Sequence, residues 1–327
     1  YTTKPETGKF KEGGLRFPLQ QNGDTFKTTL QGPENSFLAD NPPLELPLEI
    51  RLDRTRRLAE IAIDGECLEL EPGQLSDWVN LSFKAAPGIK VTGLCRMMVT
   101  EMDEHFSLYI TPLNIDPEKP AMPISHPSYY ATYLAKKTGP FATLGLAEDT
   151  WALNEEVVDD GTFLQQTYDI DRERQNMFFA AMDRLRKGAL VCVFDATDRI
   201  QHMFYQYTPE ARADGSQPEA SPHANAVEAC YQRMDSLIGK TRERLGENDG
   251  IAAALQYRGN VSAYQGDGAA AQADFERSLR IREDARDLLG AAHLYNNLGI
   301  IAQRQGDFDD AQVLFERGLA INRQMNN

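Results

Sequence analysis

The sequence predicts an α/β segment with a β-rich region, followed by an all-α segment of helical repeats. Three observations lead to this prediction. Apolar and polar residues alternate in short segments between residues 48 and 110, a wholly apolar run stands at 189–194, and residues beyond 250 repeat with a period of 40. Alternation is typical of half-buried strands, whereas a short, wholly apolar run is typical of a strand buried on both faces.

Size and composition limit the functions that the chain can have. Its 327 residues are enough for two or three domains, and the apolar fraction of 41% is normal for globular protein. The formal net charge of −15 disfavours binding to nucleic acid or to an anionic membrane through a general electrostatic field. No apolar stretch reaches 18 residues, so we expect no membrane span.

Cysteine usage and the N-terminal sequence indicate the compartment. The four cysteines are far apart and form no C-x-x-C pair, so we expect neither a disulfide framework nor a structural zinc site. The N-terminus has no signal-peptide pattern, and a reducing cytoplasm fits best. Because the sequence lacks an initiator Met, we expect a processed chain or a fragment of a longer one.

The first part of the chain divides into an irregular segment and a β-rich region. Residues 1–46 are rich in Gly, Pro and polar residues, which predicts irregular structure with a short strand near Leu15–Leu19. Residues 47–117 alternate with period two, which predicts an antiparallel sheet. The strand candidates are Leu48–Leu52, Ala59–Ile63, Cys67–Glu71, Val79–Phe83, Val91–Val99 and Phe106–Ile110.

Residues 118–249 follow an α/β pattern. Helical periodicity predicts helices over Tyr129–Lys136, Thr162–Arg186 and Ala224–Leu245. Gly188 ends the second helix, and the apolar run Ala189–Phe194 follows it directly. A helix, a glycine, a buried strand, a polar cluster and another helix in this order predict a parallel sheet covered by helices.

Residues 250–327 contain an internal repeat. The residues Gly259, Gly266, Ala271, Phe275, Leu279 and Ile281 recur 40 positions later as Gly299, Gly306, Ala311, Phe315, Leu319 and Ile321. A small residue, a Gly-Asp turn, and then Ala and Phe at helical spacing resemble the tetratricopeptide repeat. The resemblance implies two helix pairs whose concave surface binds a protein or peptide partner. The alternative is an unrelated antiparallel helix pair.

Three polar residues follow the apolar run and form the candidate site. They are Asp195, Asp198 and His202. If a helix begins at Asp198, the side chains of Asp198 and His202 lie on one face, one turn apart. A carboxylate and an imidazole so placed can chelate one divalent metal ion such as zinc. The alternative is that Asp198 caps the helix and His202 is an ordinary packed or exposed histidine.

The segment Val193–Phe204 resembles a signature of type I phosphodiesterases and nucleotide pyrophosphatases, a branch of the alkaline phosphatase superfamily. Weaker similarity lies in Gly161–Leu164, Arg172–Gln175 and Tyr231–Gly239, and the resemblance covers about residues 70–249. It implies an α/β core with residues 47–117 as a cap or insertion. It also implies hydrolysis of a phosphate-ester or nucleotide substrate with two metal ions, usually zinc; manganese is the alternative.

The resemblance assigns Asp198 and His202 as metal ligands and Asp195 as a supporting residue that does not touch the metal. The sequence departs from the family pattern elsewhere. Residues 1–60 contain no match to the Thr or Ser nucleophile, and no Asp-His-Gly element occurs for the second metal site. The chain is thus a piece of an enzyme, a natural rearrangement that kept its repeats, or an error of assembly.

Two functions follow from these patterns. The first is a metal-dependent phosphoric ester hydrolase-like protein that is incomplete as an enzyme and carries a protein-interaction module. The alternative is a non-catalytic scaffold that binds proteins through its repeats.

Overall fold

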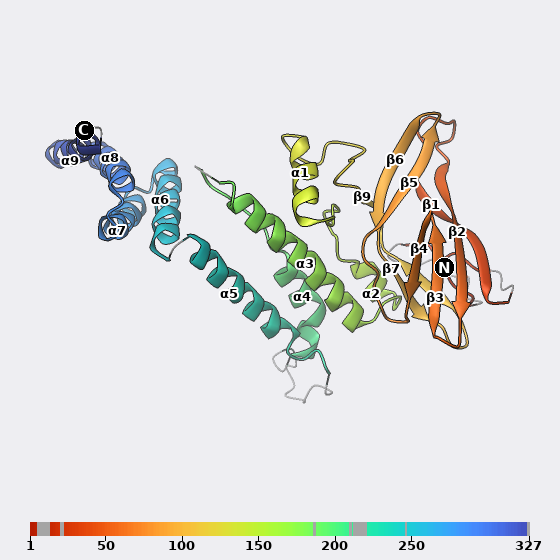
Figure 1. Ribbon diagram of the computed structural model, residues 1–327. Helices are drawn as coiled ribbons and strands as arrows, with labels where there is room; N and C mark the ends of the chain where they lie inside the picture. The colour runs from red at the N-terminus through yellow and green to blue at the C-terminus, as the bar shows by residue number, and fades with distance from the viewer. Residues whose placement is uncertain are drawn as a thin grey trace. The chain divides into compact units, whose positions relative to one another are not determined.

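The computed structural model describes residues 1–4, 14–19, 23–185, 188–208, 211, 221–245 and 247–325. For residues 247–249 it describes the backbone alone. The chain forms two compact units, Tyr1–Cys230 and Tyr231–Asn327. Strands come first and helices second in the first unit, while the second unit is helical (Figure 1). Helix α5 (Ala226–Leu245) begins in the first unit and ends in the second.

A four-stranded antiparallel sheet opens the first unit. Ile50 of the second strand pairs with Phe26 on one side and with Ile61 on the other. Every second residue from Leu44 to Leu52 is buried, because alternate side chains point to opposite faces of a strand. The strands lie in the order β1 (Thr25–Glu34), β2 (Pro43–Asp53), β3 (Leu58–Ile63) and β4 (Glu66–Leu70).

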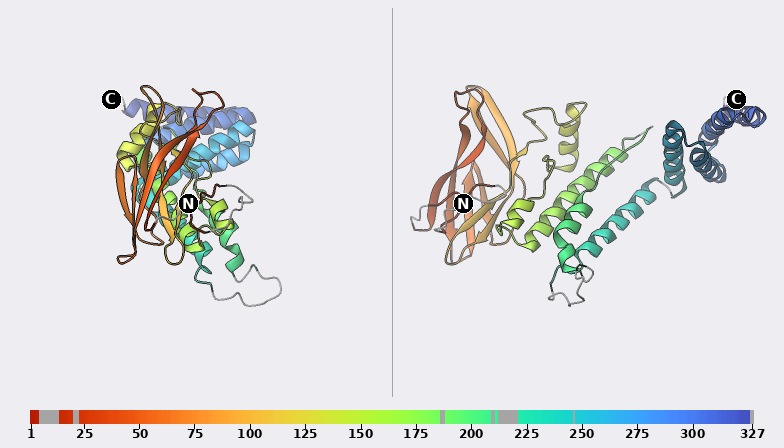
Figure 2. Two further views of the ribbon diagram at one scale, coloured as in Figure 1. Left: turned by 90° about the vertical axis from the view of Figure 1, so that its right-hand side faces the viewer. Right: turned by 180° about the vertical axis from the view of Figure 1, so that it is seen from behind.

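Two smaller sheets pack with the first around one hydrophobic core (Figure 2). The first small sheet contains β5 (Val79–Ala86), β6 (Ile89–Cys95) and β9 (Asn114–Ile115), and the second contains β7 (Met97–Glu101) and β8 (Ser107–Ile110). The rings of Phe26 and Phe106 stack in this core with centroids 5.5 Å apart. A Cβ atom at Gly32 would lie 2.4 Å from the Phe83 ring, so the close approach of β1 requires glycine there.

The alternation in the sequence correctly predicted strands at the six candidate positions, although Val91–Val99 is divided between β6 and β7. The prediction of an irregular segment over 1–46 is wrong for its last part, because it missed β1 and the start of β2. In β1 only Phe26 and Leu30 are buried, so the alternation is too sparse to be recognised. Near Leu15–Leu19 there is an isolated bridge between Thr2 and Pro18. Residues 5–13 and 20–22 lie outside the described residues.

The helices of the first unit pack on one another through a small apolar cluster. Phe163 of one helix meets Ile200 and Phe204 of another, and all three are fully buried. The long helix begins at a cap in which the Asp159 carboxylate accepts a hydrogen bond from the Thr162 backbone N–H at 2.7 Å. The elements are α1 (Tyr129–Thr138), α2 (Thr150–Asn154), α3 (Asp160–Met182), α4 (Ala196–Phe204) and the 3₁₀ turn η1 (Tyr205–Tyr207).

Helical periodicity placed α1, α3 and α5 correctly, although α3 ends at Met182; Arg186 lies outside the described residues. The prediction of a buried strand at Ala189–Phe194 is wrong. These residues have no regular secondary structure, and the side chains of Val191 and Val193 are 85% and 72% exposed. A strand needs neighbours to satisfy its backbone groups, and the named strands of the described chain pair only in antiparallel fashion. The predicted parallel sheet is therefore not present there.

The second unit contains two helix pairs in succession. In the first pair the end of one helix contacts the start of the other, since the Ser278 hydroxyl donates to the Ala252 carbonyl at 2.6 Å. In the second pair Gly318, near the end of one helix, lies against the carbonyl of Ala292, near the start of the other. Both pairs are therefore antiparallel, and the third helix also packs on the second. The helices are α6 (Glu247–Gln265), α7 (Gly268–Asp284), α8 (Leu288–Gln305) and α9 (Phe308–Met325).

Glycine has a defined role in both helix pairs. Gly266 and Gly306 adopt φ angles of 86° and 89° between the paired helices, a conformation that glycine adopts at little cost. A Cβ atom at Gly259 would lie 2.6 Å from the Phe275 ring, and one at Gly299 would lie 2.6 Å from the Phe315 ring. Glycine therefore permits each Phe ring to lie against the backbone of the partner helix.

Candidate functional site

The structure brings Asp198 and His202 together on α4. The two residues are four apart, and the His202 Nε2 atom lies 3.3 Å from the Asp198 Oδ1 atom. The His202 side chain is 73% exposed and the Asp198 side chain is 54% exposed. The spacing thus predicted the shared helix face correctly. The helix begins earlier than expected, since Ala196 is its first residue and Asp195 occupies the capping position.

The Asp198 carboxylate already has a cationic partner. Its Oδ2 atom accepts a hydrogen bond from Arg199 at 2.9 Å. The Nε atom of the same guanidinium lies 3.6 Å from a carboxylate oxygen of Glu148, a residue that is only 2% exposed. A buried carboxylate needs a compensating charge, so Arg199 has a structural reason to stay beside Asp198. A metal ion would compete with this guanidinium for the same carboxylate.

Asp195 does not join the pair to form a cluster of ligands. It forms an ion pair with Arg174 of α3. No group of three or more His, Cys, Asp or Glu side chains that could hold a metal ion is found in the described part of the chain. A catalytic zinc ion normally has three protein ligands. The described residues supply two, so they do not fit a catalytic zinc site by themselves.

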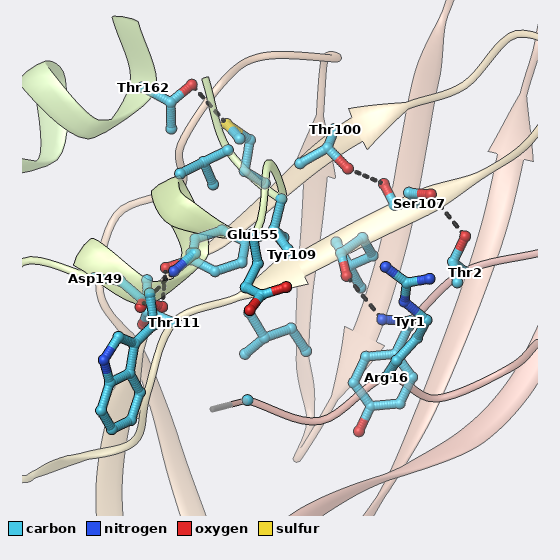
Figure 3. A pocket seen from close by; sticks show the side chains of 18 of the residues that line it. Tyr1, Thr2, Arg16, Thr100, Ser107, Tyr109, Thr111, Asp149, Glu155 and Thr162 are labelled. Carbon is cyan, nitrogen blue, oxygen red and sulfur yellow. Dashed lines mark hydrogen bonds between the residues drawn. The ribbon is translucent and has the colours of Figure 1, made fainter. Parts of the chain in front are cut away.

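A large cavity of the first unit lies elsewhere, beside β7, β8 and the start of α3 (Figure 3). Its volume is about 1020 Å³. The Tyr109 hydroxyl donates to the Asp149 carboxylate at 2.8 Å, and Asp149 also accepts from the Ala152 backbone N–H at 3.0 Å. Burial, and then the Asp149 charge, raise the pKa of Tyr109, so its hydroxyl stays protonated. These contacts hold the start of α2 against β8.

Sequence reasoning missed this cavity because its walls come from distant parts of the chain. Tyr1, Tyr109 and Trp151 all line it, and no local pattern connects them. The one available signal was the Asp149-Thr150 pair before a short apolar segment, which is a helix-start pattern and carries no information about a cavity.

The helices α6 and α8 form a second candidate surface in the second unit. The Asn297 side-chain amide donates to the Asn260 side-chain oxygen at 3.4 Å, and the Arg304 guanidinium donates to the Ala263 carbonyl at 3.5 Å. These contacts join the first helix of one pair to the first helix of the next. Tyr264 on α6 is 96% exposed. Amide, guanidinium and aromatic groups are therefore available on α6 and α8.

A two-point ion pair joins the two helices of the first pair. The Arg258 guanidinium donates to the two carboxylate oxygens of Asp274 at 2.6 Å and 2.5 Å. The hydrogen bond from Arg258 holds the pKa of Asp274 below its ordinary value. The carboxylate is nearly buried, whereas the arginine side chain is 66% exposed.

Comparison with known families decides the nature of this segment, whose helix pairs repeat with a period of 40. Residues 250–324 match the tetratricopeptide repeat family. The tetratricopeptide repeats thus comprise the four helices α6–α9, and the family is one whose helix pairs stack to present a binding surface. No curated protein matches the chain. None of the helices in the described ranges is long and apolar enough to cross a membrane.

Proposed function

We propose that this chain binds a polypeptide partner through its tetratricopeptide repeats. The observation that carries the proposal is the side-by-side placement of α6 and α8, in the segment that matches the family. Stacked repeats present an extended surface to which successive first helices contribute. An extended peptide along this surface would contact both repeats at once.

The polar groups on these helices suit a peptide backbone. The side-chain amides of Asn260 and Asn297 can each donate and accept hydrogen bonds, and the Arg304 guanidinium donates several. An extended peptide has unpaired backbone N–H and C=O groups that need such partners. Tyr264 adds an aromatic surface for an apolar side chain of the partner.

Selection from a library of displayed random peptides, followed by calorimetry with the best peptides, tests this proposal. The variant Asn297→Ala/Arg304→Ala should bind the selected peptides about tenfold more weakly or worse, since each change removes a directional partner. The matched control is Asn322→Ala/Arg323→Ala, which removes the same residue types from exposed positions of α9. Its affinity should equal that of the wild type.

Two results would reject the proposal. One is the absence of any saturable peptide binding. The other is an equal loss of affinity in the α8 variant and the α9 control, because such a loss would not depend on the α6 and α8 surface.

A metal-dependent phosphoric ester hydrolase of the phosphodiesterase or nucleotide pyrophosphatase type is the second candidate function. The observation in its favour is the adjacency of Asp198 and His202, 3.3 Å apart on one turn of α4. Zinc and manganese titrations, run beside hydrolysis of bis-(p-nitrophenyl) phosphate, test it. Metal-dependent turnover that is lost in Asp198→Ala and in His202→Ala would support the hydrolase. No specific metal binding would reject it and would leave the repeats as the functional part.

A further inference from the structure

The two repeats differ in what covers their second helix. The second helix of the first repeat, α7, is covered by α8: Leu294, Leu298 and Ile301 of α8 share one buried cluster with Ala271 and Phe275 of α7. Leu314 of α9 packs against the same cluster. The residues of α9 that match Ala271, Phe275 and Leu279, each 40 positions later, are Ala311, Phe315 and Leu319.

Exposure shows that the matching face of α9 is open. Phe275 is 2% exposed, whereas Phe315 is only half-buried. Leu279 is half-buried, whereas Leu319 is 49% exposed. A groove of about 320 Å³ lies along this face, and Phe308, which is 68% exposed, lines it with Ala311, Phe315 and Leu319. The second repeat thus presents the apolar surface that the first repeat buries beneath α8.

A polar feature of the interface also recurs. On α7, the Gln272 amide donates to Glu276 at 2.9 Å, and its Oε1 atom accepts a hydrogen bond from Gln305 of α8 at 3.4 Å. On α9, the Gln312 amide donates to Glu316 at 2.8 Å in the same way. Gln312 is exposed and lines the groove, so the groove contains the counterpart of the glutamine that accepts from Gln305 on α7.

We propose that the groove on α9 binds an amphipathic helix of a partner protein whose contact face reproduces that of α8. Numbered from its first contact residue, this helix has apolar side chains at positions 1, 5 and 8 and a glutamine-like donor at position 12. These positions correspond to Leu294, Leu298, Ile301 and Gln305. The inference rests on the proposed protein-binding function and assigns a second surface to it, apart from the α6 and α8 surface.

The chemistry of the groove favours a helix over an extended peptide. Four of the lining residues are apolar, and the polar ones are Gln303, Gln312 and Glu316. A helix satisfies its own backbone hydrogen bonds, so it can lay an apolar face in such a groove without leaving buried polar groups unpaired. The established contact of α8 with α7 shows that a helix fits the same arrangement of side chains.

A fluorescent peptide with the sequence of residues 288–305 provides the test, with anisotropy as the readout. The peptide carries Tyr295→Glu and Gly299→Ala, which remove the apolar character of its other face and raise its helix propensity. It should bind the full chain saturably. The variant Leu319→Asp should weaken binding about tenfold or more, because the contact would bury an unpaired carboxylate. A second variant, Phe308→Asp, should act in the same direction.

The matched control is Val313→Asp, which places the same charge on α9 at a residue that is 48% exposed and does not line the groove. It should bind like the wild type, and a peptide with Leu298→Asp should not bind. Circular dichroism should give the same helix content for the three chain variants and the wild type.

Three outcomes would overturn the inference. Binding unchanged by Leu319→Asp would mean that the peptide displaces the chain's own α8 from α7. An equal loss of peptide affinity in Val313→Asp would mean that the added negative charge lowers the affinity wherever it lies on α9, and not because it occupies the groove. Self-association that Leu319→Asp abolishes would mean that a second copy of the chain occupies the groove. Failure of the proposed function is distinguishable, because Asn297→Ala/Arg304→Ala should leave helix binding intact and Leu319→Asp should leave extended-peptide binding intact.

Discussion

The two repeats have the same backbone arrangement but are held together by different interactions. Arg258 and Asp274 form an ion pair in the first repeat, and the matching positions in the second are Leu298 and Leu314, which lie in one apolar cluster. The Ser278 hydroxyl donates to the Ala252 carbonyl in the first repeat. In the second, Gly318 lies against the matching carbonyl of Ala292, since a Cβ atom there would be 3.2 Å from its oxygen.

This difference distinguishes the parts of the repeat that stay the same from those that vary. The features common to both repeats are the glycine in the turn, the glycine against the phenylalanine ring, and the alanine at the helix contact. These features set the distance and angle between the paired helices. The side chains that join the helices elsewhere vary between polar and apolar pairs.

The largest expected effect comes from α8, because this helix packs on α7 of the first repeat and on α9 of its own repeat. Leu294 of α8 is fully buried. Leu294→Ala should lower the free energy of unfolding of the second unit by about 2–5 kcal/mol, because it leaves a cavity between the repeats. Leu289→Ala, at a residue of the same helix that is 51% exposed, should change it by less than about 0.5 kcal/mol.

Urea denaturation can assign this effect to the right unit. Both tryptophans, Trp78 and Trp151, belong to the first unit, so their fluorescence reports its unfolding. Far-UV circular dichroism reports the helices of both units. Leu294→Ala should move the dichroism transition and leave the tryptophan transition in place. A shift of both transitions would contradict the assignment to the second unit.

A smaller effect should distinguish Gly259 from Gly299, the two glycines that lie against phenylalanine rings. The Phe275 ring is covered by α8, so it cannot move away from a new methyl group at position 259. The Phe315 ring borders the open groove and has room to turn outward. Gly259→Ala should therefore cost about 1–3 kcal/mol of unfolding free energy, and Gly299→Ala should cost less. Equal costs in urea denaturation would mean that the groove face is as closely packed as the covered face.

The smallest effect should come from exchanging the polar pair of the first repeat for the apolar pair of the second. Arg258→Leu/Asp274→Leu should leave the unfolding free energy at neutral pH within about 1 kcal/mol of the wild type, since the arginine is largely exposed and such pairs contribute little. A larger loss in urea denaturation would show that the ion pair has a structural role that the leucine pair does not replace.

The same double variant should change the pH dependence of stability. The pKa of Asp274 in the folded chain lies below its ordinary value of 3.8, so the folded carboxylate loses its charge at lower pH than the unfolded one. Its contribution is fully present above the unfolded pKa and is lost as pH falls through the folded pKa. The difference in urea midpoint between wild type and double variant should therefore decrease as the pH is lowered below about 4. A constant difference would contradict this sign.

Local patterns in the sequence predicted the strands and helices well. Alternation identified the strands from Leu48 to Ile110, and the offset of 40 identified the repeats, because both signals lie within a few turns or strands of the chain. The spacing of Asp198 and His202 predicted their adjacency for the same reason.

The features that depend on distant partners could not be predicted. The apolar run Ala189–Phe194 has the composition of a buried strand, but composition does not supply the neighbouring strands that would bury it. Arg199 could not be recognised as a bridge from Asp198 to a buried carboxylate, because that carboxylate belongs to Glu148, which is distant in sequence. The groove on α9 was hidden for a similar reason, since the repeat pattern is the same whether or not a helix covers it.

The fixed period of the repeats has a consequence for how such a chain can be lengthened. Because α9 presents the residues with which α7 receives α8, a duplicated block of 40 residues added after α9 would begin with a helix that already fits. The glycine and the phenylalanine ring that the block copies would give it its internal geometry without any new choice of side chains. The residues of the last repeat therefore already specify how a further repeat would pack on it.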